Sequence, residues 1–226
     1  MLPNFNNAQL LETALTHRSA LNERASKATE SNERLEFLGD AVLELLATTF
    51  LYDAFPKESE GVLTAYRSAL VKTTSLASVA QKLNLGAKIL MSKGEEAGGG
   101  RENISLLADT FEAILGALYL DQGLQAVETF LKTHLFGDIE RILAEKLYKD
   151  PKSELQEIVQ ADGLQTPAYQ VIAEKGPDHD KIFTISITLD QEVIATGSGK
   201  SKQLAQQAAA EAALVEYAKG KKRSRS

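Results

Sequence analysis

Three absences narrow what this chain of 226 residues can do. It contains no cysteine, which excludes disulfides, zinc–thiolate sites and thiol nucleophiles. No uncharged run approaches the roughly 18 apolar residues of a membrane-spanning helix. The first residues, MLPNFNNAQLLETALTHRSA, lack the basic and then apolar pattern of a secretory signal. We therefore expect a cytoplasmic protein without a membrane partner.

An excess of positive charge is also missing. The chain has 31 acidic against 25 basic side chains and a net charge of −6. Residues 150–226 are nearly neutral, with 10 bases and 11 acids. Five of those bases lie in the last eight residues, KGKKRSRS. Composition alone therefore does not indicate a nucleic-acid partner.

Hydrophobic periodicity is helical from Ala8 to Lys149, which predicts an all-α domain over 1–149. The expected helices are 8–15, 31–53, 59–84, 104–121 and 123–147. Between two of them, the glycines of GEEAGGGRE (94–102) are most simply a flexible connector, with closure over a ligand as the alternative.

The periodicity changes at YKDPKSELQ, where Asp150 can cap a helix that has Pro151 at its first position. That helix should end near Ala161. Strands are expected at 168–175, 181–189 and 191–197, followed by a helix from Ser201. Four alanines should let the last helix lie close to the sheet: Ala205, Ala208, Ala209 and Ala212. The fold class is therefore multidomain, with an α+β domain (α-β-β-β-α) over 150–219 and a basic disordered tail at 220–226.

One predicted helix carries an unusual row of acids. Within NERLEFLGDAVLELL (32–46), spacings of three, four and four place four carboxylates on one stripe: Glu33, Glu36, Asp40 and Glu44. The apolar side should contain Leu35, Leu38, Val42, Leu45 and Leu46. A solvated face is the ordinary interpretation. However, Phe37 and Leu43 flank the stripe, and the nearest base, Arg34, points elsewhere. Because like charges one turn apart destabilise a helix, we expect a cation from outside the sequence.

A second acid pair lies in LLADTFEAILGALYLD, where Asp109 and Glu112 are three residues apart and share a helix face. Gly116 lies on the same face, and Gly39 adjoins Asp40 on the first helix. A glycine inside a helix costs about 1 kcal/mol relative to alanine, so it often marks close packing. We therefore expect the two helices to approach closely and to bring both acid pairs together.

Clustered carboxylates cannot all stay ionised cheaply without a cation. Oxygen ligands without histidine or cysteine favour Mg²⁺, Mn²⁺ or Ca²⁺ over zinc. Magnesium with open water positions suits phosphoryl chemistry. From spacing alone, two helical acid pairs are a weak motif, and surface or helix-cap roles for these acids are the alternative.

At these residues the chain resembles a known family. NERLEFLGDAVL (32–43) is similar to the signature of ribonuclease III, and three further stretches match in order: LTHRS (15–19), EGVLTAYRSALV (60–71) and LLADTFEAILGALYLD (106–121). Residues 150–217 resemble the double-stranded RNA-binding domain that follows the nuclease domain in the bacterial enzymes. The resemblance covers nearly the whole chain.

The resemblance implies a Mg²⁺-dependent endonuclease, with Mn²⁺ as a possible substitute, that cuts double-stranded RNA as a homodimer. The products would carry 5′-phosphate and 3′-hydroxyl ends with a short 3′ overhang, in ribosomal and messenger RNA processing. The implied metal ligands are Glu36, Asp40, Asp109 and Glu112, of which Asp40 and Glu112 are catalytic. A non-catalytic duplex-RNA-binding regulator is the alternative, and retention of all four acids argues against it.

Other positions match with less defined roles. Phe37 corresponds to an aromatic that inserts into the partner subunit, although a core position within the domain is an alternative. Glu33 and Glu60 match acids nearer the dimer or RNA side. Arg67 is either a salt bridge or an RNA contact, and His134 has no motif around it.

The HRS sequence at 17–19 invites comparison with a catalytic triad. No G-x-S-x-G turn or oxyanion motif accompanies it. A structural role for His17 at a helix end is therefore expected.

Duplex RNA is recognised largely by shape, through minor-groove hydroxyls and phosphates. The positions that match RNA contacts of the family fall in three segments. The first helix holds Gln156 and Glu157 with Gln160, and the turn GPDH between the first two strands holds Pro177 and His179. The start of the last helix holds Lys200, Ser201 and Lys202. A helix N-terminus favours anions near those lysines. Gln203 stands where the family usually has a second lysine, so one phosphate contact is in doubt. With 6 bases and 11 acids over 150–219, non-specific affinity should be modest.

Overall fold

A change from helices to strands divides the chain, as the periodicity predicts. The computed structural model describes residues 2–23, 29–177 and 181–223, without the side chains of residue 22 and residues 220–223. Its residues form two units, an N-terminal unit at Met1–Tyr148 and a C-terminal unit at Lys149–Ser226. The division lies one residue before the boundary expected from the sequence. Within the described ranges no helix is both long and apolar enough to cross a membrane.

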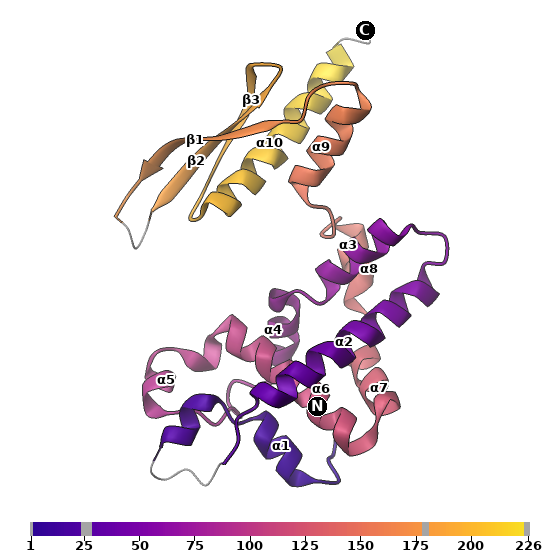
Figure 1. Cartoon of the computed structure of the whole chain (residues 1–226), viewed down its shortest axis with the longest axis vertical. Helices are drawn as coiled ribbons and strands as arrows, with labels where there is room; N and C mark the ends of the chain where they lie inside the picture. Colours follow the sequence, from indigo (N-terminus) through magenta and orange to yellow (C-terminus); the bar gives the residue numbers. More distant parts are fainter. Residues whose placement is uncertain (1, 24–28, 178–180, 224–226) are drawn as a thin grey trace. The chain divides into compact units, whose positions relative to one another are not determined.

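The N-terminal unit is all-α (Figure 1). Its α-helices are α1 (Ala8–Ala14), α2 (Glu33–Ala54), α3 (Glu60–Leu70), α4 (Thr73–Lys82), α5 (Lys93–Ala97), α6 (Ile104–Gln122), α7 (Leu124–His134) and α8 (Asp138–Ala144). The described residues of this unit also form the 3₁₀ turns η1 (Arg18–Asn22) and η2 (Gly100–Glu102). The helices expected at 59–84 and 123–147 are each two helices. Their apolar pattern continues across the breaks because both parts cover the same core.

Helix α6 lies at the centre of this core. Phe111 and Ile114 are fully buried, and the only charged residues of this largely apolar helix are three acids, Asp109, Glu112 and Asp121. A helix that is apolar nearly all round must be covered on all sides. This explains why α6 meets α1, α2, α4 and α7.

The contact between α2 and α6 is a contact between backbones. A Cβ atom added to Gly39 would lie 1.8 Å from the Glu112 carbonyl oxygen, and one added to Gly116 would lie 2.2 Å from the Leu35 carbonyl oxygen. Any larger side chain would push the helices apart. The close approach predicted from these two glycines is confirmed.

The buried side of α2 differs from the expected one. Leu45 is 55% exposed, whereas Leu43, which we placed beside the acid stripe, is 1% exposed. The prediction for Leu45 was therefore wrong. The helix is covered from more than one direction, so its buried side is broader than a single leucine stripe.

The glycine stretch expected as a flexible connector contains α5 and η2. Arg101 holds it, because its Nη1 donates to the carbonyl oxygens of Gly86 at 2.7 Å and Ile89 at 3.2 Å. Its Nε also donates to Glu96 at 2.7 Å. Gly99 has a φ of +84°, which glycine adopts without strain.

The C-terminal unit has the predicted α-β-β-β-α order (Figure 1). Its elements are α9 (Pro151–Ala161), β1 (Ala168–Lys175), β2 (Ile182–Leu189), β3 (Glu192–Gly199) and α10 (Lys202–Arg223). The strands form an antiparallel sheet in the order β1-β2-β3. Asp150 caps α9 by accepting a hydrogen bond from the Lys152 N–H at 3.2 Å, as predicted.

Helices α9 and α10 pack against β2 to form the second core. A Cβ added to Gly197 of β3 would lie 2.1 Å from the Ala209 nitrogen, so α10 lies directly against the sheet. The buried alanines are Ala205, Ala209, Ala210 and Ala213. Two of the four alanines we expected, Ala208 and Ala212, are only partly buried. Helix α10 continues to Arg223, so residues 220–223 of the expected disordered tail are helical; residues 224–226 lie outside the description.

Candidate metal centre and RNA-binding surface

The glycine contact places the two acid pairs opposite each other. One carboxylate oxygen from each of Glu36, Asp109 and Glu112 lies within 4.8 Å of the other two. We call these three residues the acid cluster. Two helices that are distant in sequence supply it, and no other group of three potential ligands occurs within the described residues. The spacing is close enough for the three to share one cation.

Asp40 lies beside the acid cluster rather than in it. Its side chain is exposed, and its oxygens fall outside the 4.8 Å group. Its negative charge nevertheless contributes to raising the pKa of both Glu36 and Glu112. The structure therefore brings together three of the four expected ligands and leaves the fourth at their edge.

Burial and mutual repulsion make these acids costly to ionise. Burial, followed by repulsion from Asp40 and Asp109, raises the pKa of Glu112 from 4.5 to about 8. Burial is also the largest cause of the raised pKa of Glu36 and of Asp109. A divalent cation would relieve this repulsion, and its binding would displace the protons. The donor set is all oxygen, which fits a hard cation.

The outer acids of the α2 stripe have partners within the chain. Glu33 lies 3.6 Å from Arg18 Nη1, and Glu44 lies 3.0 Å from Arg67 Nε. Our expectation that the whole stripe needs an external cation was therefore wrong for these two residues. Both arginines come from other elements, η1 and α3, which a helical pattern within one segment cannot reveal. No ion pair to Glu36 or Asp40 occurs among the residues that the structure describes.

His17 borders the acid cluster but is engaged in structure. It is the N-cap of η1, with Nδ1 accepting from the Ser19 N–H at 3.3 Å and lying 2.8 Å from Ser19 Oγ. Ser19 Oγ in turn accepts from the Ser92 N–H. The predicted helix-end role is confirmed. Sequence reasoning missed that His17 lines a hollow of about 230 Å³ with Glu36 and Asp109, where its charge partly offsets the burial that raises the pKa of Asp109.

Phe37 projects from the same helix into solvent. It is 81% exposed, which excludes the alternative of a core position within the domain. It lines a groove of about 710 Å³ together with Leu10 and Leu120. An aromatic ring so exposed beside an apolar groove is typical of a surface that another molecule covers.

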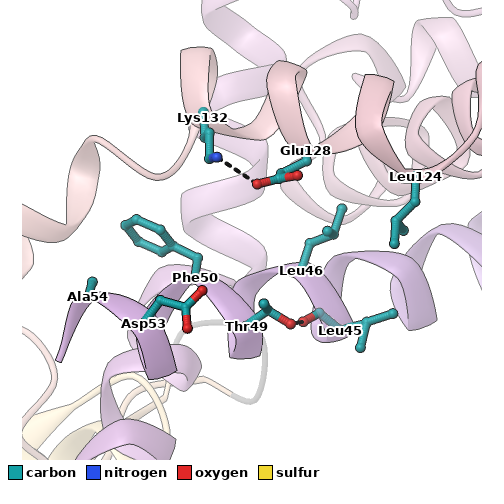
Figure 2. A pocket seen from close by; sticks show the side chains of 9 residues that line it. All are labelled: Leu45, Leu46, Thr49, Phe50, Asp53, Ala54, Leu124, Glu128 and Lys132. Atoms are coloured by element: carbon teal, nitrogen blue, oxygen red, sulfur yellow. Dashed lines mark hydrogen bonds and ion pairs between the residues drawn. The ribbon is translucent and has the colours of Figure 1, made fainter. Parts of the chain in front are cut away.

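Two further grooves run along α2. Glu60 lines one of about 450 Å³, with Tyr52 and Arg67, and does not belong to the acid cluster. The other, of about 510 Å³, lies between α2 and α7 and has Leu46, Phe50 and Leu124 around it (Figure 2). At its rim Glu128 pairs with Lys132 at 2.6 Å. Neither groove gathers the facing carboxylates that distinguish the acid cluster.

In the C-terminal unit the expected RNA contacts are surface residues. Gln156, Glu157 and Gln160 are exposed on α9, and Pro177 is exposed after β1. His179 lies outside the described residues.

Lys200, Ser201 and Lys202 are exposed where α10 begins. Ser201 Oγ accepts from the Leu204 N–H at 3.2 Å and so caps the helix. Lys202 Nζ lies 3.6 Å from Glu174 of β1 and 5.6 Å from the centre of the Phe183 ring. The acid that competes for Lys202 comes from another strand, and sequence reasoning did not find it.

Comparison with known proteins connects both units to families. A family described as Ribonuclease-III-like matches residues 7–139, and a double-stranded RNA binding motif matches residues 151–217. Ribonuclease 3 of Bacillus licheniformis is 50% identical over 95% of this chain and 86% of its own length. The ribonuclease 3 of a Roseiflexus species is 48% identical over 93% and 90%. The solved nuclease domain of Campylobacter jejuni ribonuclease III is 44% identical, with a TM-score of 0.54 over 61% of this chain and 87% of that one.

Proposed function

The chain belongs to the ribonuclease III family and is an endoribonuclease of double-stranded RNA, and we propose that it cuts with Mg²⁺ held between α2 and α6. Residues 1–149 act as the nuclease domain and residues 150–219 as the double-stranded RNA-binding domain. The family matches to residues 7–139 and 151–217 support this division. The cut leaves a 5′-phosphate, a 3′-hydroxyl and a short 3′ overhang, and it serves ribosomal and messenger RNA processing in the cytoplasm.

The observation that carries the metal assignment is the convergence of three carboxylate oxygens within 4.8 Å. Glu36, Asp109 and Glu112 would ligate the ion, and Asp40 would complete what we call the metal centre. A bound Mg²⁺, or Mn²⁺ in its place, supplies a Lewis acid that activates water and stabilises the leaving oxygen. Asp40 and Glu112 are the residues to which we assign the catalytic role.

The half-buried position of Glu112 prepares it for this task. The backbone contact at Gly39 fixes α2 against the Glu112 carbonyl, so the carboxylate is held on a rigid element. Burial disfavours its charge, and a divalent cation would restore it. The chain thus holds ligands whose geometry is set before the ion binds.

Two copies of the chain would work together, with Phe37 and Glu33 at the dimer interface. The 81% exposure of Phe37 beside an apolar groove of about 710 Å³ supports this, because a symmetric pair can place each ring on the partner's groove. The resemblance implies one cleavage centre for each RNA strand, so both subunits are needed for a double cut. Glu60 lies in a separate groove and has a secondary role at the RNA side.

RNA contact falls mainly to the C-terminal unit. We assign it to Gln156 and Glu157 on α9, to Pro177 and His179 after β1, and to Lys200, Ser201 and Lys202 at the start of α10. The exposure of the described residues among these, and the N-terminus of α10 beside the lysines, support contact with phosphates and 2′-hydroxyls.

The direct test is cleavage of a long RNA duplex by the purified full-length chain. Mg²⁺ should permit double-strand cleavage, and a chelator should abolish it. A single strand and a DNA duplex of the same sequence should stay intact. Tight duplex binding without cleavage at any Mg²⁺ or Mn²⁺ concentration would favour the non-catalytic regulator instead.

A further inference from the structure

Arg67 of α3 reaches across to the acidic stripe of α2. Its Nε lies 3.0 Å from Glu44 Oε2, and its Nη1 donates to Thr48 Oγ1 at 2.8 Å. Glu44 and Thr48 are one helical turn apart, so a single guanidinium spans both. The planar, permanently charged fork of arginine suits this arrangement better than lysine.

Glu44 is the next carboxylate after Asp40 along the same stripe. Side chains four residues apart on a helix have Cβ atoms about 5–6 Å from each other. The charge of Glu44 also reaches the opposite helix, where it adds to the repulsion that raises the pKa of Glu112. Without a partner, the Glu44 carboxylate would add one uncompensated negative charge beside the metal centre, on the side of Asp40.

We propose that Arg67 is a positioning residue of the metal centre: by pairing with Glu44, it keeps a further carboxylate from attracting the cation and so sets how tightly the ion binds. The inference rests on the proposed function, because it presupposes the metal centre between α2 and α6. It assigns Arg67 to a charge role within the protein rather than to contact with RNA.

Arg67 could instead simply hold α2 and α3 together as a clamp. The two roles predict different directions of change in cation affinity when either partner is substituted. In Arg67→Gln the Glu44 carboxylate is left unpaired, and cation binding becomes tighter. In Glu44→Gln the guanidinium is left unpaired, and cation binding becomes weaker. For a unit charge about 10 Å from a divalent ion in a water-like dielectric, each change is roughly fourfold in Kd. A clamp predicts that both substitutions loosen the site and weaken binding.

The experiment is calorimetric titration of Mn²⁺ into the full-length, RNA-free chain. It compares the wild type, Arg67→Gln, Glu44→Gln and the double variant, with thermal melts to show that each is folded. Lys132→Gln is the matched control, since it removes a cation paired with Glu128 within α7 and should leave Mn²⁺ binding unchanged. The double variant should return to within about twofold of the wild type, because neither charge is then left over.

Opposite shifts in the single variants that cancel in the double variant would support the charge role. Weaker binding in both, uncorrected in the double variant, would overturn it, as would unchanged binding in both. Glu112→Gln separates this failure from that of the proposed function. If Mn²⁺ binding is unaltered in Glu112→Gln, the metal centre itself is wrongly placed, and the role of Arg67 falls with it.

Discussion

The candidate metal ligands of the N-terminal unit and the candidate RNA contacts of the C-terminal unit occupy opposite kinds of position. Glu36, Asp109 and Glu112 are partly buried on two helices whose backbones touch. The RNA contacts that are described are exposed, and several lie where an element begins or ends. Chemistry needs fixed distances, so it is placed where packing allows little movement. Recognition of duplex shape depends on contacts spread over a surface, and each can be weak.

The electrostatic settings differ in the same way. In the acid cluster like charges are held together, so ionisation is disfavoured until a cation binds. Beside the candidate RNA contact Lys202 opposite charges already meet: Glu174 lies within 4 Å of both Lys181 and Lys202. In the acid cluster, a bound cation would relieve the repulsion between the carboxylates. At Lys202, a phosphate would have to compete with the Glu174 carboxylate.

The largest effect on stability should come from filling the space between α2 and α6. Gly116→Ala places a Cβ 2.2 Å from the Leu35 carbonyl oxygen, so the helices must separate. Overpacking of this kind costs about 1–3 kcal/mol of stability, and a displacement near 1 Å at a catalytic site can reduce the rate by about 100-fold. Thermal melts and single-turnover cleavage measure the two consequences.

Gly61→Ala is the matched control, because nothing lies within 4 Å of a Cβ added there on α3. It should be neutral or stabilise the chain by up to about 1 kcal/mol and leave cleavage unchanged. Equal behaviour of the two alanine variants would mean that the backbone contact does not hold the acid cluster in place.

The next effect concerns the proposed dimer. Burying a phenylalanine contributes about 1.5–3 kcal/mol, and a symmetric dimer buries it twice, so Phe37→Ala should raise the dimer dissociation constant by at least about 100-fold. The monomers should then cut poorly. Analytical ultracentrifugation measures the constant, with Tyr52→Ala as control, since Tyr52 is also exposed on α2 but about 22 Å farther along the helix. An unchanged dimer at low micromolar concentration would contradict the interface.

Sequence reasoning succeeded for the acid cluster because helical geometry is regular. The spacing of Asp109 and Glu112 fixes a common face, and Gly39 and Gly116 mark where two backbones meet. It failed for Glu33 and Glu44, whose arginine partners come from η1 and α3. Pairing between segments depends on how the helices are arranged in space, and periodicity within one helix carries no information about that.

A smaller effect is a dependence of stability on pH in the absence of metal. The pKa of Glu112 rises from 4.5 to about 8 in the folded chain, so the folded protein keeps a proton that the unfolded chain releases. The contribution of Glu112 to the free energy of unfolding is therefore largest below pH 4.5 and falls as the pH rises to about 8. Melts in chelator should show this decline for the wild type and a shallower one for Glu112→Gln. Parallel curves would mean that Glu112 is ionised without cost.

The smallest effects are expected on the RNA surface. Lys202→Ala should weaken duplex binding a few-fold, without base preference, and reduce the salt slope by about one phosphate contact. Glu174→Gln should instead tighten duplex binding by about threefold, because it releases Lys202 and removes a negative charge. Fluorescence anisotropy over a salt series measures both. An unaltered slope in Lys202→Ala would show that this lysine does not contact phosphate.

The order of elements in the C-terminal unit was predictable because period two replaces period 3.6 at a capped helix start. The contacts that influence RNA affinity could not be predicted from this pattern. Lys202 pairs with Glu174, 28 positions earlier in the chain, because β1 and the start of α10 meet only in the folded unit. The buried alanines of α10 also differ from the expected ones, since contact with Gly197 fixes the rotation of the helix.

The central claim is that chemistry resides in the metal centre while RNA affinity resides mainly in the C-terminal unit. Glu112→Gln tests it most directly, because the substitution keeps the side-chain volume and removes the charge. Single-turnover cleavage and duplex affinity should be measured on the same preparation at saturating Mg²⁺. We predict that cleavage falls by several orders of magnitude while affinity stays within a few-fold of the wild type. Retained cleavage, or loss of cleavage and affinity together, would contradict the account.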